Sequence, residues 1–536
     1  MDSGKLKSNI SPQEQFARVE SPNIQRSTFD RSHGCKTTLD AGKLYPVFID
    51  EALPGDTINL SATMFGRLAT PLKPIMDNIK FDLHFFSVPN RLVWDNWEKF
   101  NGQQDNPSDT TDYLIPSITS PAVTGYAEES IFDYFGLPTK IPGLEHSALP
   151  LRAMNLIWNE WYRDQNLQDS VPVNKGDGPD LPADYTILKR NKRKDYFTSA
   201  LTTPQKGTAV SVPLGSTAPV TGLGKLNQNY LVNNISVYET GGSALETYTK
   251  SAAIDAASGN DYQFYVEEDP NNLGYPNVYA DLSSATAATI NSLREAFQIQ
   301  RMYERDARGG TRYTELVKAH FGVTSPDARL QRPEYLGGGS VDVNITPIAQ
   351  TSATESATPQ GNLSGVGTFT VNNNGFVKSF TEHEIVLGFV SVRADLNYQQ
   401  GLHKMWSRQT RFDFYWPSFA HLGEQAILNK EIYAQGAPAD DNVFGYQERY
   451  AEYRYKPSIV TGQYRSNHST SLDLWHLAQE FSALPALNDS FIQENPPIDR
   501  VVAVASEPHF LLDCHFNMKH SRPMPTFSTP GLIDHF

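Results

Sequence analysis

The sequence predicts a mainly β protein, an antiparallel sandwich or jelly roll interrupted by long insertions. Alternating apolar and polar residues, the pattern of strands with one buried face, recur in two distant blocks, 57–86 and 384–518. Gly (36), Pro (35) and aromatic residues (11%) are abundant, which favours strands joined by long loops. Because a block of two strands is not stable alone, both blocks are predicted to form one interrupted domain.

Individual elements follow from local patterns. Seven segments are predicted as strands: 57–64, 79–86, 384–392, 411–416, 446–455, 500–505 and 512–518. Asn90 is predicted to cap a helix that follows the second of them, and amphipathic patterns predict further helices at 151–164 and 289–308. Two Gly-rich segments, GGGSVDV (337–343) and SGVGTFT (364–370), lack phosphate-binding patterns and are interpreted as flexible joints.

The predicted domain order has six parts. They are an N-terminal arm (1–40), a first part of the β domain (41–135), a helical and loop insertion with a basic run (136–200), a surface insertion (201–285), a helical insertion (286–340), and a second part of the β domain with an extended tail (341–536). The segment 201–285 holds three Lys, no Arg and eight acidic residues among many turn residues. This composition indicates a solvated excursion.

Bulk properties exclude several classes. No apolar run reaches the roughly 20 residues of a membrane span, and the N-terminus lacks the apolar stretch of a secretory signal, so we expect no membrane insertion and no signal-directed export. The net charge of −15 argues against binding nucleic acid with the whole surface. The two cysteines, Cys35 and Cys514, are interpreted as free thiols in a reducing compartment.

Positive charge gathers in two places. The run KRNKRK contributes Lys189, Arg190, Lys192, Arg193 and Lys194, and the helix at 289–308 carries Arg294, Arg301, Arg305 and Arg308 on one stripe. Either set could contact nucleic-acid phosphate or clamp acidic residues of a neighbouring chain. The alternatives are a solvated loop for the run, and ion pairs with nearby acidic residues for at least half of the stripe.

Signals for catalysis are weak. In a strand, His383 would point away from Glu382 and Glu384, so this triplet does not form a ready metal site, and GxSxG and HExxH motifs do not occur. A jelly-roll carbohydrate-binding or glycoside-active protein remains the alternative, which needs two facing carboxylates. We expect no cofactor and no metal.

The C-terminal segment SRPMPTFSTPGLIDHF (521–536) combines prolines, which oppose regular structure, with apolar residues that need burial. It is predicted to be an extended tail that docks along its own sandwich or onto a neighbouring subunit. The anchors are Phe527, Leu532, Ile533 and Phe536.

Four longer stretches carry a family resemblance. HFFSVPNRLVWDNWEKFNG (84–102), the segment 294–339, YWPSFAHLGEQAILNKEIYAQG (415–436) and the terminus MPTFSTPGLIDHF resemble the major capsid proteins of gokushoviruses in the Microviridae, small icosahedral bacteriophages with circular single-stranded DNA. The resemblance implies an eight-stranded antiparallel jelly roll of the viral capsid type and no enzymatic role. It also implies pentamers assembling into a T=1 shell of 60 copies, with the surface insertion at the threefold axes contacting the host.

Several partners are implied by the same resemblance. They are the single-stranded DNA genome, a small basic DNA-binding protein, an internal scaffolding protein, a pilot protein and a host cell surface receptor. The implied location is the virion, after assembly in the cytoplasm of the bacterial host.

Overall fold

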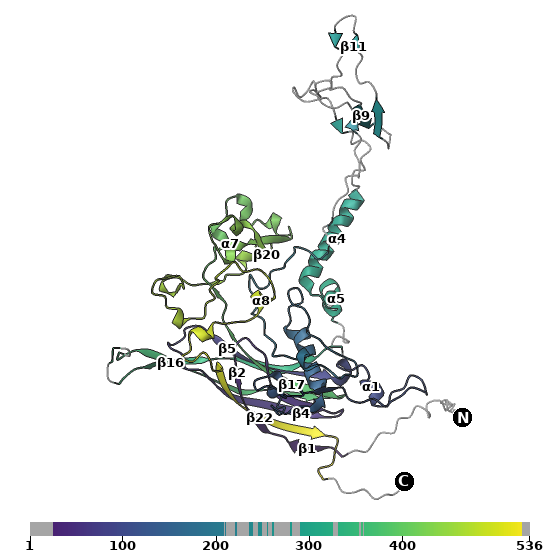
Figure 1. The fold of residues 1–536 in the computed structure, drawn as a ribbon, viewed down its shortest axis with the longest axis vertical. Coiled ribbons are helices and arrows are strands. Elements are labelled where there is room, and N and C mark those ends of the chain that lie inside the picture. Colours follow the sequence, from purple (N-terminus) through teal and green to yellow (C-terminus); the bar gives the residue numbers. More distant parts are fainter. Residues whose placement is uncertain are drawn as a thin grey trace, which may run out of the picture. The chain divides into compact units, whose positions relative to one another are not determined.

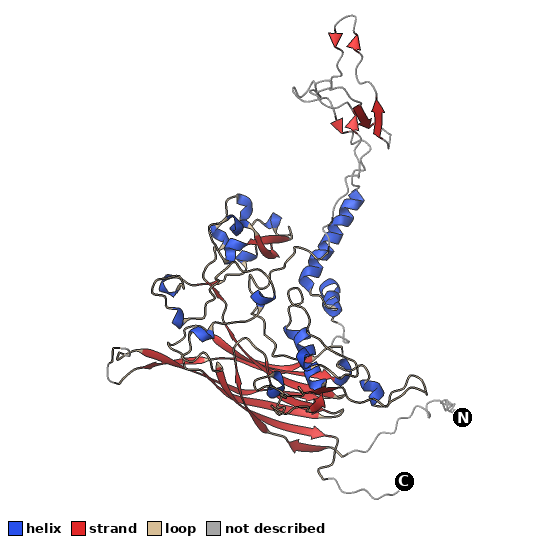
Figure 2. Ribbon diagram, in the orientation of Figure 1, coloured by secondary structure: helices blue, strands red, loops and turns tan. Residues whose placement is uncertain are grey.

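The computed structural model describes residues 25–207, 210, 290–324, 331–352, 355–356 and 359–527, with six short strands between 220 and 280 (Figures 1 and 2). Contacts divide the chain into two units. The larger unit combines Met1–Pro204 with Gly310–Phe536, and the smaller is Gln205–Gly309. We call the larger unit the body.

The body contains an antiparallel six-stranded sheet. Its order is β1 (Ser27–Asp30), β22 (Phe510–Arg522), β4 (Thr57–Leu68), β16 (Leu363–Ser379) and β15 (Asn344–Ala349), and β2 (His33–Leu39) also pairs with β22. β4 and β22 alternate between buried and exposed residues along most of their length. The expected one-face-buried strands at 57–64 and 512–518 are therefore confirmed.

A second antiparallel sheet has the order β14 (Glu334–Asp342), β5 (Ile79–Pro89), β17 (Glu384–Ala394) and β3 (Tyr45–Ala52). The strands predicted at 79–86 and 384–392 are its two central ones. β5 was expected to be buried on one face only, yet it is buried or half-buried along its whole length. Its second face is covered by helical and loop segments of the body.

The main core lies between the two sheets. It combines the inward side chains of β4, β16 and β22 with those of β3, β5 and β17. Phe81 stacks on Phe369 with ring centroids 4.3 Å apart, and Phe48 contacts Phe516 at 5.2 Å. The body is thus a mainly β antiparallel sandwich, consistent with a capsid-type jelly roll, with six and four strands in its sheets against the eight expected.

A second core covers the outer face of the four-stranded sheet. Here α3 (Leu149–Ile157), which continues as a π-helical turn to Tyr162, packs with Trp94 against β5 and β17, and confirms the helix predicted at 151–164. Short elements complete this region: α1 (Trp97–Phe100), α2 (Ile131–Tyr134), β6 (Ser117–Thr119) and β7 (Glu145–Ser147). Asn90 does not cap the expected helix. Residues 90–92 instead form a 3-10 turn, which follows Pro89 and has no side-chain cap.

A third core holds the loop-rich region between β17 and β22. Its elements are β18 (Asn397–Tyr398), β19 (Glu424–Leu428), α7 (Asn429–Ile432), β20 (Val443–Glu448), β21 (Ser458–Ile459) and α8 (Asp489–Ile492). The strands predicted here are mostly wrong. Residues 411–416 form a 3-10 turn and loop, and only the first three residues of 446–455 are in a strand. Residues 500–505 form the end of a 3-10 turn and a loop with one isolated bridge at Val502.

The Gly-rich segments are strands, so their interpretation as flexible joints is wrong. GGGSVDV lies mostly in β14 and SGVGTFT in β16. At Gly338 a Cβ atom would lie 2.0 Å from the carbonyl oxygen of Leu83 on the paired strand β5. These glycines allow backbones to approach closely rather than to bend freely.

Cys35 and Cys514 are directly opposite each other in the β2–β22 pairing, although 478 intervening residues hide this from the sequence. Both are free, as predicted. Burial raises the pKa of each thiol.

The smaller unit contains α4 (Ile290–Gly309), which confirms the helix predicted at 289–308. Three antiparallel pairs of very short strands join it: β8 (Val220–Thr221) with β13 (Tyr279–Ala280), β9 (Ile235–Tyr238) with β10 (Leu245–Tyr248), and β11 (Ile254–Asp255) with β12 (Asn260–Asp261). After α4 the chain returns to the body, where α5 spans Tyr313–Phe321. Within the described parts of the chain, no helix is both long and apolar enough to cross a membrane.

Candidate functional site

The basic run at 189–194 follows α3 and its π-helical turn in the body. Isolated backbone bridges join Lys189 to Lys43 and Asn191 to Gln493, so this stretch is extended. Successive side chains therefore alternate in direction. Arg190 and Lys192 are buried, whereas Lys189, Arg193 and Lys194 are exposed.

Arg190 is part of a buried charge cluster on the four-stranded sheet. Its Nη1 donates to Asp82 Oδ2 at 2.7 Å and also to the Ser391 hydroxyl, while Arg393 Nη2 lies 2.7 Å from the same carboxylate oxygen. Burial alone would raise the pKa of Asp82, but the charges of Arg190 and Arg393 outweigh it and hold that pKa below its ordinary value. Two guanidinium groups thus share one carboxylate oxygen, and the buried Glu494 lies near enough to interact with both of their charges.

Lys192 is held inside the body as well. Its Nζ donates to Gln479 Oε1 at 2.8 Å and to the Phe491 carbonyl at 2.7 Å, and lies 4.6 Å from the centre of the Phe491 ring. Burial lowers the pKa of Lys192 to about 8. The structure therefore places Arg190 and Lys192, two of the five candidate contact residues, in interactions within the chain.

A cavity of about 550 Å³ opens beside the run. Its lining joins six cationic side chains to one acidic side chain and several aromatic rings: Arg163, Arg190, Lys192, Arg193, Lys194 and Arg393, with Asp164, and with Phe86, Trp161, Tyr162 and Tyr335. Burial and the nearby Arg190 charge lower the pKa of His84, also in the lining, to about 4, so this histidine is neutral at pH 7. Such a lining suits an anion attached to a planar or apolar group.

The exposed members of the run differ in their contacts. Lys194 forms an ion pair with Asp164 and donates to the Thr198 carbonyl at 3.1 Å. The side chains of Lys189 and Arg193 make no hydrogen bond or ion pair with the described residues.

The other predicted residues lie elsewhere. Arg294, Arg301, Arg305 and Arg308 are exposed on α4 of the smaller unit. β22 ends at Arg522, and the tail anchor Phe527 is 84% exposed in the single chain. The anchors Leu532, Ile533 and Phe536 lie outside the described residues.

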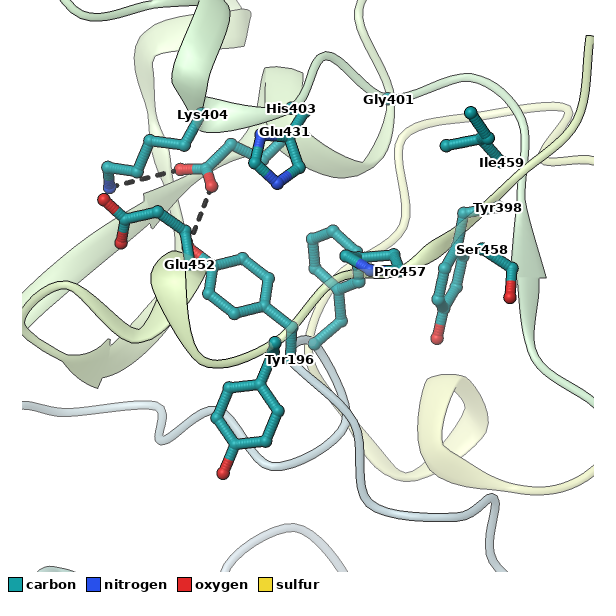
Figure 3. A pocket seen from close by; sticks show the side chains of 12 residues that line it. Tyr196, Tyr398, Gly401, His403, Lys404, Glu431, Glu452, Pro457, Ser458 and Ile459 are labelled. Atoms are coloured by element: carbon teal, nitrogen blue, oxygen red, sulfur yellow. Dashed lines mark hydrogen bonds and ion pairs between the residues drawn. The ribbon is translucent and has the colours of Figure 1, made fainter.

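Paired carboxylates, the requirement of a glycosidase, occur at another pocket, which Figure 3 shows in close-up. Glu431 and Glu452 both line it. Glu431 accepts hydrogen bonds from the Tyr196 hydroxyl at 2.9 Å and from the Leu428 amide at 3.0 Å, and Glu452 accepts from Arg408 at 3.1 Å and Gln425 at 2.7 Å. Both carboxylates are thus engaged in hydrogen bonds and ion pairs that hold this region of the body together.

The residues Glu382, His383 and Glu384, considered above as a metal site, do not converge on one point, because the two glutamates form separate ion pairs. Glu382 pairs with Arg91 at 2.8 Å, and the buried Glu384 pairs with Lys378 at 3.3 Å. Among the residues that the structure describes, no cluster of three or more His, Cys, Asp or Glu side chains could hold a metal ion.

Comparison with known proteins gives a match along almost the whole chain. A family model described as "Capsid protein (F protein)" matches residues 17–532. The chain is 53% identical to "Capsid protein VP1" of Bdellovibrio phage phiMH2K, with 98% of both chains covered. Its identity to the proteins of the same name from Chlamydia phage 1 and Spiroplasma virus 4 is 46% and 36%, each over 96% of this chain and 97% of the relative.

Proposed function

Because the chain belongs to the capsid protein (F protein) family and is therefore a structural, non-enzymatic component of the virion, we propose that 60 copies form a T=1 icosahedral shell. Pentamers are the proposed intermediate, and a circular single-stranded DNA genome is the proposed content. The observation that carries the proposal is the full-length similarity to phage capsid proteins, on a chain whose body is an antiparallel sandwich.

Electron microscopy of the expressed chain tests this function. We expect closed spherical particles of one size. A chain that stays monomeric and cleaves glycans would instead support the jelly-roll carbohydrate-active alternative.

The negative net charge of the chain affects how a shell of this protein would enclose DNA. Each chain has a net charge of −15, so a shell of many copies must offset its repulsion of DNA by counterions, local basic patches or a basic partner. The small basic DNA-binding protein is the proposed partner for this purpose. An internal scaffolding protein and a pilot protein are proposed partners in assembly, which takes place in the host cytoplasm.

The exposed cations of the basic run are proposed to contact genome phosphate or acidic residues of a neighbouring subunit. Replacing Lys189, Arg193 and Lys194 together by Ala is expected to lower the packaged DNA or the yield of shells. Where the contact is to phosphate, each lost contact should lower the salt slope of DNA binding by about one unit. Quantifying DNA per particle and particle yield measures both effects.

A matched control removes three exposed lysines elsewhere in the body, Lys36, Lys140 and Lys175. This control should change yield and DNA content much less. Variant particles with a full genome at normal yield would rule out the role of the run. The arginine stripe of α4 is the second proposed contact of this kind, and its four residues can be replaced in the same way.

The tail is proposed to anchor neighbouring subunits or to dock along its own sandwich. A side chain as apolar and as exposed as Phe527 gains about 2 kcal/mol when it is buried, so a chain that ends before Thr526 should assemble poorly. Particle yield and heat resistance are the measurements. A full-length variant with Ser at the four anchors separates loss of apolar contact from loss of length, and unchanged particles from both variants would exclude an anchoring role.

A further inference from the structure

The loop between β18 and β19 exposes an unusual number of large apolar side chains. Residues 402–422 include six aromatic residues and two Arg, but only one Lys and one Asp. The most exposed rings are those of Trp406, Phe412, Phe414, Tyr415 and Trp416, together with Tyr453 from the following segment. We call these six residues the aromatic patch.

Contacts within the body hold much of the aromatic patch in place. The Phe412 carbonyl accepts hydrogen bonds from the Tyr450 hydroxyl at 3.0 Å and from Arg449 at 3.2 Å. The Arg408 guanidinium lies 4.3 Å from the centre of the Tyr453 ring and 5.3 Å from that of Phe414. These rings are thus presented to solvent in a fixed arrangement, which reduces the entropy lost on binding.

The patch has the size and composition of a protein interface. A half-exposed aromatic side chain leaves on the order of 100 Å² accessible, so the six side chains together expose about 600 Å². Aromatic residues and Arg are enriched, and Lys, Glu and Asp depleted, at the centre of protein interfaces. An area of this order approaches the roughly 800 Å² that each partner contributes to a stable complex.

Charge argues for protein rather than nucleic acid as the occupant. The hollow of about 440 Å³ beside the patch is lined by four cationic and four acidic side chains: Lys404, Arg408, Lys430 and Arg449, with Asp413, Glu424, Glu431 and Glu452. Single-stranded DNA is bound by aromatic rings in a groove with excess positive charge, and the lining of this hollow has no such excess. A charge-balanced border instead suits the mixed charges of another protein surface.

The pocket of Figure 3 provides a concave element at the same surface. It encloses about 60 Å³ between Tyr398, Pro457 and Ile459, and shares Lys404, Glu431 and Glu452 with the charge-balanced hollow. Ile459 is 77% exposed at its rim. Interfaces concentrate their binding energy where an apolar side chain of one partner fills such a pocket in the other.

We infer that the aromatic patch and this pocket form a docking surface for a second copy of the chain. The inference rests on the proposed shell function, since a shell requires each copy to bury surface against others of the same sequence. It goes beyond that function by assigning one face of the body to the contact.

The test replaces Phe414 and Trp416 together by Ala. Both side chains are about half exposed, so the fold should lose little, whereas association should weaken at least about tenfold. The measurements are particle yield by electron microscopy, sedimentation of the unassembled chain, and the melting temperature. The matched control is the pair Tyr313→Ala and Phe321→Ala, two exposed aromatic residues on α5, and Trp416→Phe should retain assembly.

A second arm identifies the occupant directly. Tyr415→p-benzoylphenylalanine is irradiated in assembled particles, or in concentrated protein, and the cross-linked product is identified by mass spectrometry. Cross-links to a second copy, with loss of assembly in a folded double variant, support the inference. Cross-links to DNA, or a double variant that assembles at the wild-type yield, overturn it while the shell function stands.

The two proposals fail separately. If the wild-type chain forms no particles, the shell function fails, and a cross-link between two copies in solution still supports the docking surface. If that cross-link is missing as well, the docking surface is overturned too.

Discussion

Replacing Asp82 by Ala is expected to destabilise the body by about 3–5 kcal/mol, because it removes the carboxylate between the buried Arg190 and the largely buried Arg393. Arg190 and Arg393 both lie 2.7 Å from Asp82 Oδ2, and neither can lose its charge at ordinary pH. Without Asp82, two positive charges face each other between the four-stranded sheet and the basic run. The denaturation midpoint in urea, followed by tryptophan fluorescence, measures the loss.

Two controls sharpen this prediction. Asp513→Ala removes the carboxylate of an exposed pair with Lys36 and should change stability by less than about 1 kcal/mol. Adding Arg190→Leu to Asp82→Ala removes one of the two unpaired positive charges and should recover part of the lost stability. A urea midpoint for Asp82→Ala equal to that of the wild type would show that the charge cluster contributes nothing.

The same cluster predicts the direction of a pH dependence. The pKa of Asp82 is lowered in the folded state, so its contribution is complete above the unfolded value of about 4 and is lost as the pH falls through the folded value. The stability difference between the wild type and Asp82→Ala should therefore shrink on acidification.

Replacing residues 210–280 with a short Gly-Ser linker is expected to abolish most adsorption to host cells while the body still folds. The replaced segment lies within the smaller unit, whereas the three cores described above belong almost entirely to the body. Loop-closure entropy changes by only about 0.6 kcal/mol for each doubling of length, so shortening the connection costs the body little. This result would support the proposal that the acidic insertion faces outward at the threefold axes and contacts the host receptor.

Adsorption assays with purified particles measure the effect, and circular dichroism checks the fold. As a control, the same linker replaces the exposed loop at 103–110, which should leave adsorption unchanged. Unaltered adsorption of the insertion variant would refute the host-facing role. A chain that fails to fold would show instead that the insertion belongs to the core, and a partial loss of shell stability would indicate that insertions brace one another.

Sequence patterns identified the strands whose side chains meet the core in regular order. β4 and β22 alternate along most of their length, and β17 is apolar at most of its positions, so each carries its own signal. The sequence did not identify β14 and β16 as strands. Their glycines are needed because adjacent strands leave no room for a Cβ atom, and those strands lie far away in the chain. Residues 411–416 were wrongly predicted as a strand. Their aromatic residues favour strands, but aromatic residues are equally common in exposed interface surfaces.

The sequence identified the basic run, but not which of its residues are buried and which are exposed. Alternation in an extended segment would have separated Arg190 and Lys192 from their neighbours, had the backbone conformation been known. The partner of Arg190 lies 108 positions away on β5, and that of Lys192 lies 287 positions away. Such pairings arise only from the fold.

The position of β22 in its sheet has a consequence for the order of synthesis. Among the described residues β22 is the last strand in chain order, yet it lies between β4 on one side and β1 and β2 on the other. Until the ribosome has released residues 510–522, β4 keeps one unpaired edge, and β1 and β2 lack the strand with which they pair in this sheet. A chain broken off before the end of β22 therefore cannot complete this sheet, so only copies translated through Arg522 present a finished sheet to their neighbours.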